Sequence, residues 1–215
     1  MLYEEVRREV LHTTLRLYEQ DLIHLTSGNI SLRASSEHVA ITPSGIAYET
    51  MQPEDIVIID LRGNVVDGHY KPSSETPMHT LILRERPDVN AVIHTHSTYA
   101  LTFAVLGRGI PLFCLEGLAI RGPVPVAEYA CPSTEAIGRA ALKALAGPPP
   151  VTGVLLRNHG ALAIGADLKQ AFGIAYRIET VARIYHLALQ INNDDILRFH
   201  RLISDPARGN RHMLR

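Results

Sequence analysis

Two histidines at the end of an apolar run are the first residues in the sequence whose type and spacing could do chemistry. His94 and His96 flank Thr95 directly after the run Asn-Ala-Val-Ile. Side chains two positions apart on a strand point to the same side, so both imidazoles would project together and could share an ion. Zinc favours nitrogen ligands, and a catalytic zinc site keeps three protein ligands and one open position. The best candidate for the third is His159, because it follows the apolar strand Gly-Val-Leu-Leu and Gly160 allows a tight turn behind it.

Each of these histidine motifs also has a simpler explanation. A His-x-His pair in a soluble chain is more often two incidental histidines, and an Asn-His-Gly turn alone is weaker evidence still. The other histidines show no paired spacing on one face, and we interpret them as surface or satisfied core residues: His12, His24, His38, His69, His79, His186, His200 and His212. The motifs taken singly therefore make only a modest case for a metal.

Two carboxylates are candidates for proton transfer beside such an ion. Glu75 lies at the start of a predicted helix, where its simpler role is to complement the helix dipole. Beside a dication it could instead act as a general base. Glu116 is an acid within an apolar stretch, and buried acids are uncommon without a partner. For Glu116 the alternative is an ion pair with Arg121.

Three short turns rich in Ser, Thr, Gly and Asn lie at residues 27–29, 42–45 and 73–74. Hydroxyl groups and exposed backbone N–H groups suit a phosphate, particularly at a helix N-terminus. Each turn alone is most often only a turn or a cap. The informative observation is that all three occur in a chain that also carries the His-x-His strand.

The elements that must position these residues alternate along the chain. Apolar periodicity and turn residues predict helices near residues 3–22, 73–86, 97–107, 132–147 and 167–192. Strands are predicted within residues 25–34, 38–45 and 90–96, in a hairpin over 55–68 that turns at 62–64, and in a strand-turn-strand unit over 151–165. Ser73 or Ser74 is the expected N-cap of the second helix, while Ser97 and Gly107 are expected to bound the third.

The bulk composition is that of an ordinary globular protein. With 215 residues and no repeat or composition break, we expect one domain over 1–215, with a C-terminal tail over about 193–215. The net charge of −1 favours neither nucleic acid nor an anionic membrane as a partner. No window approaches the ~20 apolar residues of a membrane helix, and the N-terminus lacks a signal-peptide core. Together with only two cysteines, this predicts a cytoplasmic protein.

Taken in order, the motifs Ser-Gly-Asn-Ile-Ser, Thr-Pro-Ser-Gly, Pro-Ser-Ser-Glu, His-Thr-His-Ser and Asn-His-Gly resemble the class II aldolase/adducin family, above all its L-fuculose-1-phosphate aldolase branch. The resemblance runs from the first helix to about Asn192. It implies an α/β fold, a three-layer αβα sandwich around a central, mostly antiparallel sheet. It also implies a zinc ion held by His94, His96 and His159, with Glu75 at or next to the metal. The implied phosphate site comprises Gly28, Asn29, Ser44, Gly45, Ser73 and Ser74.

The activity that the resemblance implies is that of a zinc-dependent sugar-phosphate aldolase. Such an enzyme would cleave a ketose 1-phosphate similar to L-fuculose 1-phosphate into dihydroxyacetone phosphate and an aldehyde. Zinc would act as the Lewis acid, and Glu75 would move the proton at the carbon whose bond breaks. No lysine Schiff base is required. Family members are usually homotetramers with their sites between neighbours.

The sequence also departs from the family pattern. Leu115 stands near the position of a family tyrosine, and the tail after Asn192 lacks the tyrosine expected there. A sugar-phosphate epimerase or decarboxylase on the same zinc is therefore an alternative. So is a methylthioribulose-1-phosphate-type dehydratase, whose acid follows the His-x-His pair at about the distance of Glu116. An adducin-like binding module without metal is a third alternative, although a scaffold would not need all four metal-site residues.

Overall fold

One eight-stranded sheet runs through the described part of the computed structural model, which comprises residues 1–118 and 120–191. The strand order is β4-β3-β2-β1-β5-β8-β7-β6, and every neighbouring pair is antiparallel except β6 with β7. The strands are β1 Asn29–Arg33, β2 His38–Ile41, β3 Val57–Asp60, β4 Val65–Asp67, β5 Ala91–Thr95, β6 Val126–Ala127, β7 Gly153–Leu156 and β8 Gly160–Gly165. The strand β5, which carries His94, therefore lies between β1 and β8 in the interior of the sheet.

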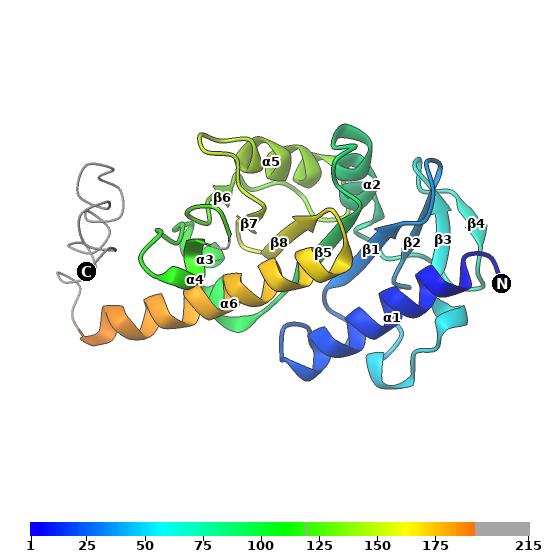
Figure 1. Ribbon diagram of the computed structural model, residues 1–215, viewed down its shortest axis with the longest axis horizontal. Coiled ribbons are helices and arrows are strands. Elements are labelled where there is room, and N and C mark those ends of the chain that lie inside the picture. Colours follow the sequence, from blue (N-terminus) through cyan, green and yellow to red (C-terminus); the bar gives the residue numbers. More distant parts are fainter. Residues whose placement is uncertain (119, 192–215) are drawn as a thin grey trace, which may run out of the picture.

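Helices cover both faces of this sheet. The α-helices are α1 Glu4–Glu19, α2 Thr76–Glu85, α3 Thr98–Leu106, α4 Leu115–Leu118, α5 Glu135–Leu145 and α6 Leu168–Ile191, and two 3-10 turns span Tyr48–Thr50 and Pro53–Asp55. One apolar cluster joins α1, α3 and α6 to the sheet, and a second joins α2 and α5 to it. Figure 1 shows α1 and α6 along one side of the sheet and α2 and α5 along the other. This confirms the expected three-layer α/β fold with a mostly antiparallel sheet.

Alternation along the strands decides which face each residue serves. In β5, Ile93 packs into the cluster under α6, whereas Val92 packs into the cluster under α2 and α5. His94 follows the same alternation and lies on the α2/α5 side with Val92. The site is thus built on the face opposite the long helix α6.

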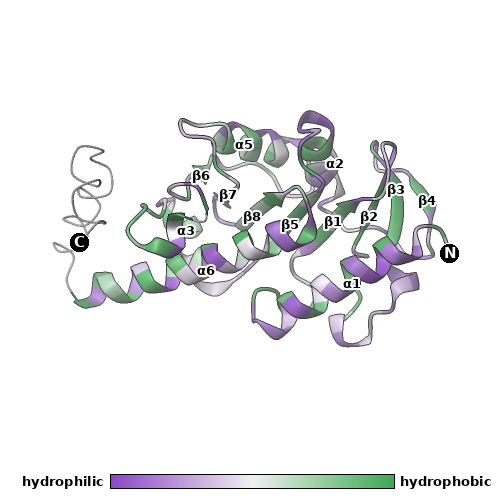
Figure 2. Cartoon of the chain, viewed as in Figure 1, coloured by the Kyte–Doolittle hydropathy of each residue, from purple (hydrophilic) through white to green (hydrophobic). Residues whose placement is uncertain are grey.

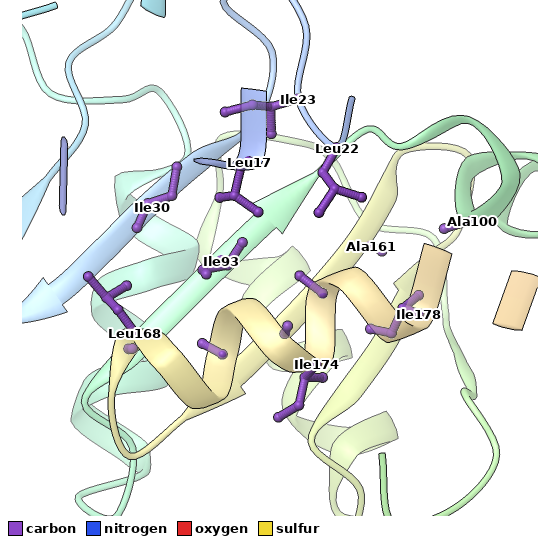
Figure 3. Packing of buried hydrophobic residues seen from close by; sticks show 14 of the residues in the cluster. Leu17, Leu22, Ile23, Ile30, Ile93, Ala100, Ala161, Leu168, Ile174 and Ile178 are labelled. Atoms are coloured by element: carbon purple, nitrogen blue, oxygen red, sulfur yellow. The ribbon is translucent and has the colours of Figure 1, made fainter. Parts of the chain in front are cut away.

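The core under α6 shows why these sequences form packed elements. Figure 3 shows Ile30 and Ile93 from the strands facing Leu168, Ile174 and Ile178 from α6. Full burial of such an aliphatic side chain contributes about 1.5–3 kcal/mol. The central strands are mainly hydrophobic while α1 and α6 alternate hydrophobic and hydrophilic residues, as Figure 2 shows. The same periodicity predicted these helices from the sequence.

The helix ends differ in part from the prediction. The N-cap of α2 is Glu75, and not Ser73 or Ser74 as predicted. Ser97 is the N-cap of α3 as predicted, but its side chain makes no capping bond. The carboxylate of Glu179 on α6 caps α3 instead, accepting the backbone N–H groups of Tyr99 and Ala100 at 2.9 and 2.8 Å. A side chain from a distant helix thereby replaces the local cap.

Three further observations complete the fold. The short elements α4 and β6 have no signal in the sequence, and Gly107 ends α3 in a left-handed conformation as predicted. None of the helices in the described ranges combines the length and apolarity needed to cross a bilayer. The predicted tail over about 193–215 and its missing tyrosine lie outside the described residues, and the single domain over 1–215 stays a prediction.

Candidate metal and phosphate site

The three histidines singled out from the sequence converge in space. His94 lies near the end of β5, His96 follows that strand, and His159 lies in the turn between β7 and β8. One ligand nitrogen from each lies within 4.8 Å of the others. The ring centroids are 4.7 to 5.1 Å apart. Residues 65 positions apart in the chain (from His94 to His159) thus form one group that could hold a metal ion.

The hydrogen bonds of the group suit metal binding. His94 Nδ1 lies 2.9 Å from the carbonyl oxygen of Ala161. Because a carbonyl can only accept, Nδ1 carries the hydrogen and the Nε2 of His94 keeps a free electron pair. That Nε2 lies 2.9 Å from the Nε2 of His96. The Nδ1 of His159 is buried and has no hydrogen-bond partner in the described residues.

Burial also keeps these imidazoles neutral, which is the form that binds metals. It lowers the pKa of His94 well below the ordinary value of 6.5. Burial likewise lowers the pKa of His96 to about 4, with a smaller lowering from His159 and an opposing increase from the Glu75 carboxylate. The pKa of His159 is lowered by burial as well. On donor type, protonation and spacing, the three residues fit a divalent cation.

The turn that carries His159 depends on two neighbouring residues. Asn158 supplies the left-handed backbone, with φ of 58°. Gly160 is required for a different reason than the sequence indicated: a Cβ there would lie 2.3 Å from the carbonyl oxygen of Thr95. The absent side chain lets the backbone of β8 pass directly beside the histidine pair.

Two of the three polar turns lie side by side. The backbone N–H of Ser73 donates to the carbonyl oxygen of Thr42 at 3.1 Å, and the N–H of Ser44 donates to that of Lys71 at 2.9 Å. Pro43 and Pro72 form an isolated antiparallel bridge between them. A surface hollow at this place is lined by residues that include Lys71, Ser73, Ser74 and Ser133.

The third turn joins these two at the start of β1. The hydroxyl of Thr42 accepts the N–H of Ile30 at 3.1 Å, and the hydroxyl of Tyr48 donates to the carbonyl oxygen of Gly28 at 2.9 Å. Gly28 has φ of +88°, and a Cβ on it would lie 2.9 Å from the carbonyl oxygen of His94. Asn29 and His94 are paired in the antiparallel register of β1 and β5. The third turn therefore adjoins the histidine group, and the other two turns are connected to it through Thr42.

Glu75 is a buried carboxylate with two different oxygens. Only 5 % of the residue is exposed. Its Oε1 accepts the backbone N–H of Ser133 at 2.8 Å and the hydroxyl of Ser133 at 3.2 Å. Its Oε2 is fully buried without a partner in the described residues. Glu75 is not part of the group of side chains that could share an ion, so its role at the metal stays a prediction.

Ser133 has no signal in the sequence as a site residue. The predicted helix over 132–147 begins only at Glu135, which leaves Ser133 in the preceding loop. Its φ of 62° is in the left-handed region that side chains rarely adopt. Ser133 lies 58 positions from Glu75, so only the tertiary structure brings the two together.

The expectation for Glu116 is wrong in its physical basis. The side chain is 55 % exposed rather than buried, and it lies on the short helix α4. Its ion-pair partner is Arg177 on α6, at 3.5 Å, and not Arg121. An acid paired at the surface has no need of a metal or substrate to satisfy it, so burial is no longer a reason for singling out Glu116, while its distance from the His-x-His pair stays a prediction.

The stability of the protein is expected to fall with pH below about 6.5. His79 on α2 is fully buried, and burial lowers its pKa from 6.5 to about 3. The unfolded chain takes up the proton first, so this contribution is complete above pH 6.5 and is lost as the pH falls towards the folded pKa. At pH 5 the loss from His79 alone is about 2 kcal/mol. Urea unfolding of chelator-treated protein at pH 7.5 and 5.0 measures it.

A matched variant isolates the contribution of His79. Glutamine does not titrate in this range. Between the two pH values, the free energy of unfolding of His79→Gln should therefore fall by about 2 kcal/mol less than that of the wild type. An equal loss in both proteins would contradict the assignment to His79.

Comparisons with known proteins agree with this geometry. The family model for the class II aldolase and adducin N-terminal domain matches residues 8–186. The chain is 39 % identical over 199 residues to a 5-deoxy-D-ribulose 1-phosphate aldolase of Bacillus thuringiensis serovar kurstaki, covering 92 % of each chain. It is 41 % identical over 173 residues to a 5-methylthioribulose-1-phosphate/5-deoxyribulose-1-phosphate aldolase of Rhodospirillum rubrum, covering 80 % of this chain and 76 % of the relative.

A solved structure of an L-fuculose 1-phosphate aldolase superposes with a TM-score of 0.82 at 35 % identity, covering 94 % of this chain and 97 % of that one. The matched family region contains the histidine group, Glu75 and all three polar turns. The chain therefore belongs to the class II aldolase and adducin family, as a member of its aldolase enzymes.

Proposed function

We propose that this chain is a zinc-dependent sugar-phosphate aldolase that cleaves a ketose 1-phosphate into dihydroxyacetone phosphate and an aldehyde. The observation that carries the proposal is the group of three imidazoles, to which the polar turn at Gly28 and Asn29 is joined through the pairing of β1 with β5. Neither the metal group nor the turns alone would distinguish a sugar-phosphate enzyme from other metal proteins. Their adjacency through the Asn29–His94 pairing supports a substrate that carries a phosphate at one end and metal-binding oxygens at the other.

In this proposal the phosphate binds in the turns formed by Gly28, Asn29, Ser44, Gly45, Ser73 and Ser74. Backbone N–H groups and hydroxyls donate to its oxygens, and the nearby Lys71 adds positive charge. Holding the phosphate fixes the sugar so that its carbonyl end reaches the histidines. A divalent metal held by His94, His96 and His159 would supply Lewis-acid stabilisation of negative charge on the substrate oxygens.

Glu75 is the group proposed to move the proton. When the bond between C3 and C4 breaks, its electron pair stays on C3, the C4 hydroxyl loses its proton as C4 becomes the aldehyde carbonyl, and a proton is added to C3. The two hydrogen bonds from Ser133 occupy Oε1 of Glu75, so the unpartnered Oε2 is the atom available for that transfer. Burial excludes water from this oxygen, so during this step the proton is exchanged with the substrate and not with solvent.

The names of the relatives narrow the substrate class within this proposal. Relatives at 39 % and 41 % identity are named as aldolases of 5-deoxyribulose 1-phosphate, whereas the fuculose 1-phosphate aldolase structure is 35 % identical. We therefore favour a ketose 1-phosphate with a short deoxygenated end, such as 5-deoxyribulose 1-phosphate, over L-fuculose 1-phosphate itself.

A panel of ketose 1-phosphates tests the function. Purified protein is assayed with added zinc or with chelator on 5-deoxyribulose, 5-methylthioribulose and L-fuculose 1-phosphates, with coupled detection of dihydroxyacetone phosphate. We expect zinc-dependent release of dihydroxyacetone phosphate, fastest from 5-deoxyribulose 1-phosphate. Conversion of substrate without this product would indicate an epimerase, decarboxylase or dehydratase. Absence of both conversion and bound metal would favour a binding module.

The same panel tests the phosphate site with a double variant, Ser73→Ala/Ser74→Ala. Loss of hydroxyl donors to a charged group costs about 1.5–3 kcal/mol each, so the KM for phosphorylated substrates should rise at least about tenfold. An unchanged KM would remove these two residues from the phosphate site.

We also propose a cytoplasmic homotetramer whose sites lie near subunit interfaces. Exposed apolar side chains gather on α3, α4 and α6: Val105, Leu106, Leu115, Leu118, Tyr176, Ile184, Leu187 and Ile191. Contact with further subunits would bury this surface. The free thiols of Cys114 and Cys131 support a reducing compartment.

A further inference from the structure

Behind Asn29 lies a buried polar chain of three side chains that the proposed reaction does not use. His79 on α2 places its Nε2 2.6 Å from Oδ1 of Asn29 and its Nδ1 2.7 Å from Oγ of Ser31. His79 and Ser31 are fully buried, and Asn29 is 6 % exposed. Asn29 and Ser31 are two apart on β1, so both point to the face that α2 covers. A histidine bonded at both ring nitrogens in a core holds its neighbours in one geometry.

The donor and the acceptor in each of these two hydrogen bonds follow from the chemistry of the side chains. An amide oxygen can only accept, so the Nε2 of His79 must carry the hydrogen that bonds to Asn29. A neutral imidazole then has a free electron pair at Nδ1, which accepts the hydroxyl hydrogen of Ser31. Burial holds His79 in the neutral form. The hydrogen bonds thus run in one direction, from Ser31 through His79 to Asn29.

This direction determines where the side-chain nitrogen of Asn29 points. With its oxygen bonded to His79, its nitrogen faces away, and this nitrogen has no hydrogen-bond partner within 1–118 and 120–191. It is not among the fully buried unpartnered atoms, so it retains solvent access. Asn29 follows Gly28 in the polar turn and is paired with His94. Two N–H groups are thereby presented where an anionic oxygen would bind.

We propose that His79, with Ser31 behind it, is a positioning residue that fixes the Asn29 amide with its N–H groups towards the substrate phosphate. This inference rests on the proposed function only for the identity of the anion. If the amide were reversed, its oxygen would face the phosphate and repel it. The residue acts through Asn29 and does not touch the substrate.

Two variants of His79 separate positioning from simple filling of the core. The amide of glutamine reaches the place of the ring Nε2, so His79→Gln keeps an N–H donor for Asn29. The amide of asparagine reaches only the place of Nδ1, so His79→Asn keeps the contact with Ser31 and loses the one with Asn29. Both remove the ring, and they differ by one methylene group and by which of the two contacts is kept.

Inorganic phosphate is the probe for the variants, measured as a competitive inhibitor and by calorimetry on the metal-loaded protein. We expect His79→Asn to weaken phosphate binding at least about tenfold and to raise the KM more than it lowers kcat. His79→Gln should stay within about threefold of the wild type. Metal content should be unchanged in both. Equal phosphate affinities in the two variants would overturn the proposal.

The tautomer of His79 gives a test that needs no variant. Nitrogen-15 NMR of the intact protein distinguishes a hydrogen on Nε2 from one on Nδ1, and we expect the Nε2–H form. A dominant Nδ1–H form would reverse the direction of the hydrogen bonds between Ser31, His79 and Asn29. It would refute the inference even if His79→Asn fails to fold. Calorimetry of phosphate binding and the NMR assignment of the tautomer do not involve aldol cleavage, so failure of the proposed function in the substrate panel leaves these two results separately decided.

Discussion

Replacing His94 with alanine should abolish metal binding and reduce aldol cleavage at least about a thousandfold. The variant removes one of the three nitrogen ligands proposed for the metal, and the stabilisation of developing charge by such a metal is worth several kcal/mol at about 1.36 kcal/mol per factor of ten. Metal content of the purified variant, measured by elemental analysis beside kcat, tests this. His12 is an exposed residue on α1, and His12→Ala is the control that should retain both metal and activity.

The fold is expected to survive this change because the His94 side chain makes one hydrogen bond outside the histidine group, to the carbonyl oxygen of Ala161, besides its packing and its contact with His96. If the buried site does not tolerate alanine, His159→Ala removes a ligand from a partly exposed turn instead. Full zinc occupancy in either folded variant would refute the assignment of the metal group.

Glu75→Gln should keep the metal and lose at least about a hundredfold in kcat. Glutamine can still accept both hydrogen bonds of Ser133 through its oxygen, so the side chain stays in place. Its nitrogen then occupies the position of Oε2 and cannot accept a proton, and a positioned general acid–base group is worth about 10²–10⁴ in rate. The direct measurement is exchange of the C3 hydrogen of dihydroxyacetone phosphate with deuterated water, followed by proton NMR.

Glu116→Gln provides the comparison for that experiment. Glu116 is exposed and paired with Arg177, so we expect hydrogen exchange to continue in this variant. Exchange at the wild-type rate in Glu75→Gln, together with loss of exchange in Glu116→Gln, would reverse the two assignments.

The parts of the site that the sequence predicts are those set by local geometry. Strand alternation places His94 and His96 on one side, and apolar runs identify the strands that pair. His159 could be named only as a candidate from its turn. The order of the motifs along the chain, rather than any single spacing, led to the family and hence to the three-layer fold.

The remaining features depend on contacts between residues far apart in the chain. The Ser133–Glu75 bonds span 58 positions, and the His79–Asn29 bond spans 50. Neither has a periodicity or motif that could reveal it. The burial expected for Glu116 failed for the same reason, because an apolar local sequence does not determine whether a four-residue helix lies at the surface.

The cap that Glu179 provides for α3 ties the geometry of the site to the long helix on the opposite face. Its carboxylate holds the backbone of Tyr99 and Ala100, which lie three and four positions after His96. A displacement of α6 along its axis would therefore pull on the peptide segment that orients a metal ligand. If a molecule bound to the outer surface of α6 shifted this helix, the shift would also change the position of His96.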